Sequence, residues 1–191
     1  MNANTVKSII MVDTILFMLF FGYTQPTVSK YFITLVDANI IALANVIRTL
    51  LAAVAFYLLS KESNKENITS PIIILLGVCS IVGYACSNII ALDYPVIRFI
   101  GNSMLDVVDE ILGLIIIKDG ITLIIDTKKG VLNFQSLRKS YRMFAGLVGS
   151  ATATLLPVPE VTIRVYIQII TIAVCHTLWI VAYIITQKIS K

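Results

Sequence analysis

Long apolar runs separated by short polar connections dominate the pattern along the chain. A helix needs about 20 apolar residues to cross the hydrocarbon core of a bilayer, and these runs are of that length. They do not alternate apolar and polar residues, as the strands of a membrane β-barrel would. The pattern therefore predicts an all-α polytopic membrane protein, with one six-helix domain over residues 1–191. The expected spans are residues 8–28 (with an extension to 36), 39–59, 71–92, 95–117, 141–157 and 161–187.

Composition supports this interpretation and argues against an enzyme. Hydrophobic residues make up 58% of the chain and charged residues only 14%, whereas about 25% of the residues in an average soluble domain are charged. The chain has no G-x-S-x-G, H-E-x-x-H or P-loop motif. The acidic "DVVDE" lacks the glycine and the second acidic motif of membrane phosphatidyltransferases. We expect no enzymatic activity, no cofactor, no metal site and no nucleic-acid partner.

Lysine and arginine residues gather in alternate connections between the predicted spans. They lie before the first span, between the second and third, between the fourth and fifth, and after the sixth. Because cytoplasmic connections are rich in these residues, we expect both termini to be cytoplasmic, in a plasma membrane or a bacterial inner membrane. Residues 118–142 are interpreted as a basic loop that fixes this orientation. The β-prone "ITLIIDTKKGVLNFQ" leaves a hairpin or an interfacial segment as the alternative.

The fourth predicted span contains an unusual polar stripe, within "IRFIGNSMLDVVDEILG". On a helix with 100° between residues, the polar side chains share a face about 120° wide. Acids at membrane depth persist only if they face water, pair with cations or hold a proton. The stripe predicts a proton- or cation-responsive site, and the alternative is an ion-paired interior that only holds the bundle together. Its members are Arg98, Asn102, Asp106, Asp109 and Glu110.

Two charged residues of other spans are candidate partners for this stripe. Arg48 lies in the middle of the second span, at a depth similar to that of Asp106, and is therefore a predicted partner for it. Asp13 lies in the first span at a depth close to that of Asp109 and Glu110. It either joins the acidic cluster or extends toward the cytoplasmic interface, as long polar side chains near a membrane boundary do.

The fifth predicted span is short and rich in small residues. Gly146 and Ser150 are four residues apart, and so are Gly149 and Ala153. Small residues at this spacing let two helices approach closely within a membrane. We therefore expect this span to pack tightly against a neighbouring helix.

The predicted arrangement resembles the N-terminal six-helix half of a major facilitator superfamily transporter. Both termini are expected inside, the first span is polar, the fourth has an arginine near its start and the fifth is rich in glycine. "VIRFIGNSM" is similar to the fourth-helix motif of that family, in which the arginine, here Arg98, is associated with proton coupling. The resemblance also implies that Asp13 corresponds to the acid of many proton-coupled members. The connection "SKESNKENITSP" departs from the family pattern, because it lacks the glycine and aspartate of the loop after the second helix.

Together these observations predict a half-size secondary transporter that moves a small solute. Members of the resembled family are built from two six-helix halves, so we expect the bilayer-embedded chain to pair with a second copy of itself or with another six-helix half. Proton binding is expected at the acids of the fourth span, with contributions from Asp13, Arg48 and Arg98. Asn102 and Gln25 are candidate substrate contacts. The alternative is a non-transporting membrane subunit whose acids pair with basic residues of a partner.

Overall fold

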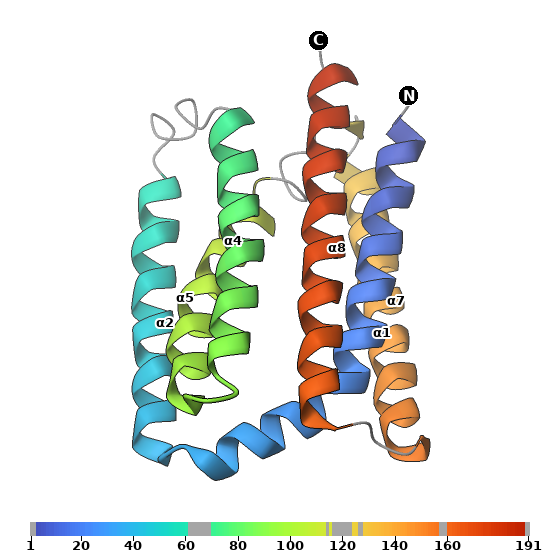
Figure 1. Ribbon diagram of the computed structural model, residues 1–191. Coiled ribbons are helices and arrows are strands. Elements are labelled where there is room, and N and C mark those ends of the chain that lie inside the picture. The colour runs from blue at the N-terminus through green and yellow to red at the C-terminus, as the bar shows by residue number, and fades with distance from the viewer. Residues whose placement is uncertain are drawn as a thin grey trace. The chain divides into compact units, whose positions relative to one another are not determined.

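The chain is almost entirely helical where its structure is described. The computed structural model describes residues 3–60, 70–113, 115, 124–125, 128–156 and 160–189. These residues contain no strand and form the helices shown in Figure 1. The all-α prediction is therefore confirmed. The helices are α1 (Ala3–Leu35), α2 (Ala38–Ser60), α4 (Ser70–Ile90), α5 (Pro95–Gly113), α7 (Lys128–Leu155) and α8 (Val161–Ile189).

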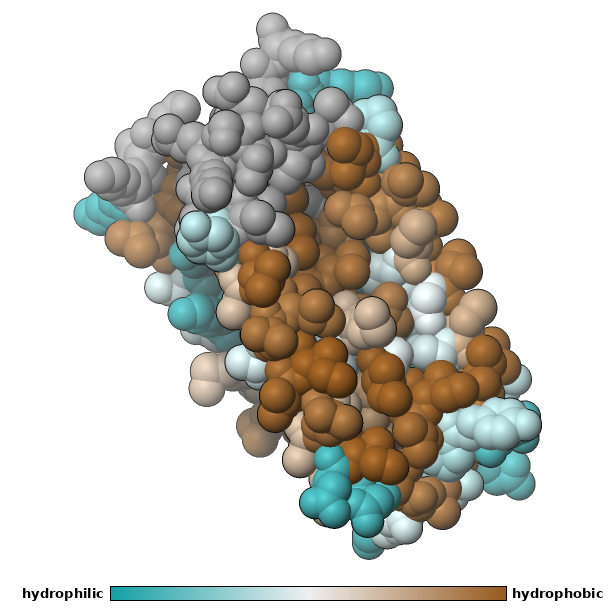
Figure 2. Space-filling view, turned by 90° about the vertical axis from the view of Figure 1, so that its left-hand side faces the viewer, coloured by the Kyte–Doolittle hydropathy of each residue, from teal (hydrophilic) through white to brown (hydrophobic). Residues whose placement is uncertain are grey.

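Four of these helices are long and apolar enough to cross a bilayer. They are α1, the Ala38–Tyr57 part of α2, the Pro71–Ile90 part of α4, and α8. Large apolar side chains lie on their outer surfaces, including Val46 at 63% exposure and Ile170 at 62%. Apolar side chains also cover most of the coloured part of the face drawn in Figure 2. Such surfaces suit contact with lipid, and the chain is compatible with an integral membrane protein.

One element differs clearly from the sequence-based prediction. The fifth span was predicted to begin at Tyr141, but α7 begins at Lys128, so the second half of the predicted basic loop is helical. The hairpin alternative is wrong for this stretch as well. Val131 and Phe134 lie about one turn apart and pack against the buried core that Val6 and Ile10 help to form. This tertiary contact explains why a segment with β-prone residues adopts a helix.

Several other predictions fall wholly or partly outside the described residues. They concern the connection 61–69, the end of the fourth predicted span after 113 except for residue 115, and the first part of the 118–142 connection except for residues 124–125. The remaining helix boundaries lie close to those expected, apart from α1, which is longer at its start.

The chain divides into two compact units. Unit 1 comprises Met1–Val28 and Ile115–Lys191, and unit 2 comprises Ser29–Leu114. The division falls inside α1, two residues after Pro26, which α1 contains. Proline has no backbone N–H and so removes one hydrogen bond from the helix. The chain passes between the units at 28/29 and again at 114/115, and the first of these crossings lies next to a locally weakened point of α1.

Unit 1 is packed closely through glycine. Val6, Ile10, Ala182 and Ile185 form a buried apolar cluster within it. A Cβ atom added at Gly149 would overlap the carbonyl oxygen of Leu19 in α1. Helix α7 therefore approaches the backbone of α1 too closely for any side chain at that position. This confirms the close packing expected of the small residues in the fifth predicted span.

Unit 2 is organised around α5, which packs against both α2 and α4. Asp37 starts α2, because its carboxylate oxygen Oδ1 accepts a hydrogen bond of 2.7 Å from the backbone N–H of Asn39. Pro95 is the first residue of α5, where its fixed φ favours the helix and its missing N–H costs nothing. These local signals favour the observed starts of α2 and α5.

Candidate functional site

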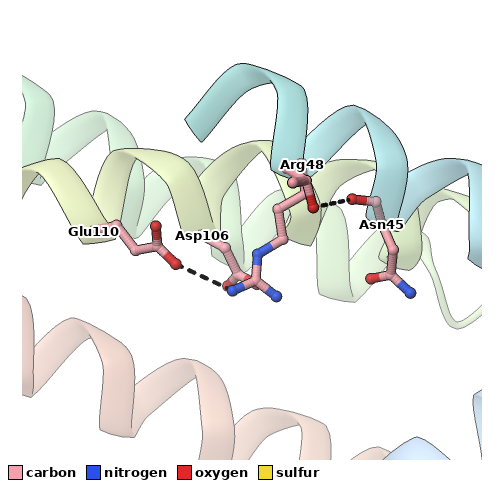
Figure 3. Close-up of polar contacts among 5 residues, drawn as sticks. Asn45, Arg48, Asp106 and Glu110 are labelled. Atoms are coloured by element: carbon pink, nitrogen blue, oxygen red, sulfur yellow. Dashed lines mark hydrogen bonds and ion pairs between the residues drawn. The ribbon is translucent and has the colours of Figure 1, made fainter. Parts of the chain in front are cut away.

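Arg48 of α2 holds two carboxylates of α5. Its Nε lies 3.5 Å from Asp106 Oδ2, and its Nη2 donates a hydrogen bond of 3.1 Å to Glu110 Oε1 (Figure 3). The predicted pairing of Arg48 with Asp106 is therefore confirmed, and Glu110 is an additional partner. The side chains of Arg48, Asp106 and Glu110 are 41%, 48% and 42% exposed, respectively. The two ion pairs of Arg48 are therefore partly exposed at the surface of the single chain.

Asp109 is held by a different helix. Its Oδ1 accepts a hydrogen bond of 2.5 Å from Ser80 Oγ of α4. We call Arg48, Asp106, Asp109 and Glu110 the α5 charge cluster. The cluster contains three carboxylates and one guanidinium group, so its formal charge is negative unless protons or other cations bind to it. Its chemistry is that of a cation-accepting surface.

The other end of the predicted stripe has a separate network. The Nη1 of Arg98 donates a hydrogen bond to Asn88 Oδ1, and its guanidinium group lies 4.8 Å from the centre of the Phe32 ring. Asn102 Oδ1 accepts hydrogen bonds from Asn88 Nδ2 at 3.0 Å and from Ser87 Oγ at 3.1 Å. Arg98 is only 5% exposed. The predicted stripe is therefore divided into a buried amide-rich end around Arg98 and an open acidic end.

Asp13 lies in unit 1 and is buried, with 2% exposure. Its Oδ2 accepts a hydrogen bond of 2.5 Å from Trp179 Nε1 of α8, whereas its Oδ1 has no hydrogen-bond partner in the described part of the chain. The alternative in which Asp13 extends to the interface is wrong, because the side chain is enclosed. The alternative in which Asp13 joins the acidic cluster stays a prediction. Trp179 was not foreseen as its partner, although a tryptophan N–H is a natural donor to a buried carboxylate.

Gln25 and Arg164 take part in further polar contacts between α1 and α8. Gln168 Nε2 donates a hydrogen bond of 2.7 Å to Gln25 Oε1. The Nη1 of Arg164 donates to the carbonyl oxygen of Tyr23 at 3.0 Å and to Thr27 Oγ1 at 2.7 Å. Arg164 has 0% exposure. Arg164 is not among the candidate residues of the sequence analysis, and its burial was not predicted.

A signal for this arrangement is nevertheless present in the sequence of α8. Polar or titratable residues recur every three or four positions on one side of this helix, a spacing that keeps them on one face. That face meets α1, where it finds polar partners. The residues are Arg164, Gln168, Thr171, Cys175 and Trp179.

Among the residues that the structure describes, no three His, Cys, Asp or Glu side chains are grouped as ligands. The polar clusters are instead made of carboxylates, guanidinium groups and amides. These groups form ion pairs and hydrogen bonds.

Comparison with known proteins found no similar protein. No model of a protein family matches the chain, and no curated protein or solved structure matches it. A functional interpretation therefore depends on the residues and their geometry.

Proposed function

We propose that the chain is a half-size secondary transporter of the plasma membrane or bacterial inner membrane. In this proposal all six helices cross the membrane, as in half of a major facilitator transporter, and both termini are cytoplasmic. Two copies enclose one polar cavity, and proton binding at the α5 charge cluster biases the opening of that cavity. The observation that supports this proposal most directly is the exposure of the cluster on a chain whose outer surface is largely apolar.

Contact between this cluster and lipid would be unfavourable. Insertion scales assign about 2.5–3.5 kcal/mol to one charged residue at the centre of a spanning helix. Side chains exposed by between 41% and 48% in the single chain therefore need water or a partner beside them. A second copy of the chain, or another six-helix half, would cover the cluster and leave a hydrated space between the halves.

The charge balance of the cluster supports coupling to protons. Arg48 pairs with Asp106 and Glu110, and Asp109 has a neutral partner in Ser80. Carboxylates this close on one helix repel one another when all are ionised. Proton binding relieves that repulsion, so the affinity for protons depends on whether water reaches the cluster. A state-dependent affinity for protons is the requirement for coupling.

The joint within α1 supports a change of state. The two compact units are connected through this helix, and Pro26 lies two residues before the division. Helices bend most readily where a proline removes a backbone hydrogen bond. A bend at this place would allow one unit to move against the other.

The second candidate is a non-transporting membrane subunit. The excess of carboxylates over guanidinium groups in the α5 charge cluster favours it, because basic residues of a partner helix would balance the charge. The two candidates differ in what covers the cluster. A transporter needs water there in at least one state, whereas a subunit needs a dry interface.

Proton movement in liposomes tests the proposed function. The purified chain is reconstituted with the dye pyranine inside, and a panel of amino acids, sugars, amines and carboxylates is added under a pH gradient. We expect at least one solute to produce a proton flux, and we expect the flux to disappear in the Asp106→Asn, Asp109→Asn, Glu110→Gln triple variant. The oligomeric state is measured in parallel by light scattering. A flux that survives in the triple variant, or a parent protein that moves protons with no solute, would contradict the proposal.

A further inference from the structure

Helix α7 is longer than the hydrocarbon core of a bilayer and less apolar than its neighbours. Its 28 residues correspond to about 42 Å at 1.5 Å per residue, whereas the hydrocarbon core is about 30 Å thick. Four of the described helices are apolar enough to cross a bilayer, and α7 is not one of them. If α7 crosses the membrane as proposed, part of it therefore lies outside the hydrocarbon core.

The surface of α7 changes in character near its middle. From Met143 to Leu155 the helix has no charged residue, and its exposed side chains include Met143 at 77% and Leu147 at 68% exposure. From Lys128 to Arg142 it has five basic residues and no acidic one. We call residues 128–142 the basic half of α7. The apolar half spans only about 20 Å, so the basic half begins at the edge of the hydrocarbon core, where long basic side chains extend to the headgroups.

Three basic side chains of this half lie on the outer surface of the helix. Lys129, Lys139 and Arg142 are exposed, and at 100° per residue they fall within an arc of about 140°. Arg138 instead turns toward α1, where its Nε donates a hydrogen bond of 2.8 Å to Thr14 Oγ1. The three exposed residues therefore form a basic surface that the other helices of unit 1 leave open.

Apolar side chains lie between these basic residues on the same half of the helix. Leu132 is 64% exposed, Leu137 51% and Tyr141 43%. Water, a soluble anion or a nucleic acid would satisfy the charges but leave the leucines exposed. The boundary between headgroups and acyl chains suits both kinds of side chain, because phosphate groups lie there beside hydrocarbon. The mixture of basic and apolar side chains therefore favours a lipid as the partner.

Two further helices of unit 1 have basic residues at the same end. Val131 and Phe134 of the basic half pack against the buried cluster that the start of α1 and the end of α8 form (Figure 1). Lys7 follows Val6 of that cluster in α1, and Lys188 lies in the last turn of α8. Basic residues of three helices thus gather at one end of the unit, which is typical of a protein surface that meets anionic headgroups.

We propose that the basic half of α7 is a docking surface for anionic phospholipid. The three exposed basic side chains bind the phosphate groups, and the exposed leucines and Tyr141 contact the neighbouring acyl chains. The partner is thus a bilayer lipid with a net negative charge, of which phosphatidylglycerol is a simple example. The inference goes beyond the proposed function, because lipid binding needs neither transport nor proton coupling and the surface belongs wholly to unit 1.

Native mass spectrometry of the purified full chain tests the proposal. The protein in a nonionic detergent receives an equimolar mixture of phosphatidylglycerol and phosphatidylcholine with identical acyl chains, and the amounts of the two lipids bound to it are compared. We expect phosphatidylglycerol to bind at least about fivefold more than phosphatidylcholine, because each basic residue near an anionic surface contributes about that factor. The two lipids differ only in their headgroups, so the ratio reports on charge.

Variants of the exposed basic residues locate the binding surface. In the Lys129→Gln, Lys139→Gln, Arg142→Gln variant the two lipids should bind to within about twofold of each other. The charge-keeping variant Lys129→Arg, Lys139→Arg, Arg142→Lys should retain the preference. Lys139→Gln alone should lower it, whereas Lys30→Gln, which removes one exposed lysine of unit 2, should leave it unchanged. Size-exclusion profiles and helical circular dichroism establish that each variant is folded.

Four outcomes would overturn the inference. One is equal binding of the two lipids to the parent protein. Another is an unchanged preference in the folded triple glutamine variant, which would mean that these residues only orient the helix. The third is loss of the preference in the charge-keeping variant, and the fourth is competition by glycerol 3-phosphate at the concentration of the lipid, which would indicate a soluble anion as the ligand. The Asp106→Asn, Asp109→Asn, Glu110→Gln triple variant separates this inference from the proposed function, because it should keep the lipid preference even though its proton coupling is lost.

Discussion

Units 1 and 2 both contain charged side chains among apolar helices, but these side chains differ in their exposure and in their partners. In unit 2, Arg48 is about half exposed and has two carboxylate partners. In unit 1, Arg164 and Asp13 are almost completely buried, and each has polar atoms without a partner in the described structure. The α5 charge cluster therefore has ion-pair partners for its arginine. The buried charges of unit 1 instead keep polar atoms without a hydrogen-bond partner in the described structure.

This difference shows where a ligand has most to contribute. Pairing two opposite charges at an exposed position changes stability little, because the surroundings screen both. A buried charged atom without a partner keeps its desolvation cost until something binds to it. The partly exposed α5 charge cluster can therefore exchange protons with its surroundings more readily than the enclosed groups of unit 1 can.

The largest expected effect concerns the buried carboxylate of unit 1. Trp179→Phe removes the donor to Asp13 Oδ2 and leaves the carboxylate without the hydrogen bond that the structure shows. We expect a loss of about 2–3 kcal/mol in the free energy of unfolding, measured by detergent denaturation in mixed micelles. Asp13→Asn keeps an acceptor for Trp179 and should cost much less. In the Asp13→Asn background, Trp179→Phe should cost clearly less than in the parent; an unchanged cost would show that Trp179 acts only through packing.

A pair of glycine substitutions compares the packing of the two units. Gly149→Ala places a methyl group against the backbone of α1, which cannot move aside, and should cost about 1–3 kcal/mol. Gly83→Ala in unit 2 meets only the flexible end of the Leu105 side chain, 2.8 Å away. There the higher helix propensity of alanine should offset the contact and leave stability nearly unchanged. Thermal unfolding followed by circular dichroism measures both, and similar losses in the two variants would refute the contrast.

The sequence was sufficient for the helical class and for one ion pair. Apolar runs predicted the helices because length and hydropathy decide whether a segment can cross a bilayer. Comparison of depth along two parallel spans predicted the pairing of Arg48 with Asp106, since each is a similar number of residues from its helix start. Ser80, the hydrogen-bond partner of Asp109, was not predicted, because a single serine in an apolar helix does not stand out in the sequence pattern.

The start of α7 and the burial of Arg164 could not be predicted in the same way. The residues from Lys128 to Arg142 are polar enough for a loop, and only their contact with the core of unit 1 makes them helical. Arg164 lies at a helix start, where arginines usually reach an interface. Its enclosure depends on the groups of α1 beside Pro26, which belong to a segment far away in sequence. Both features depend on tertiary contacts rather than on local pattern.

The smallest effect is expected for the most conspicuous charges, those of the α5 charge cluster. Arg48→Ala removes the cation from Asp106 and Glu110, but the side chains are between 41% and 48% exposed, so the remaining carboxylates can be solvated or protonated. We therefore expect a loss of only about 1 kcal/mol in the free energy of unfolding in detergent. Adding Asp106→Asn should recover part of it, because one uncompensated carboxylate is removed.

High salt should reduce the difference in the free energy of unfolding between the parent and Arg48→Ala, since exposed ion pairs are screened. A loss of about 3–5 kcal/mol that salt does not change would instead indicate a fully buried pair. That result would remove the contrast between the two units, because it would place the α5 charge cluster inside a dry interface as the subunit alternative requires.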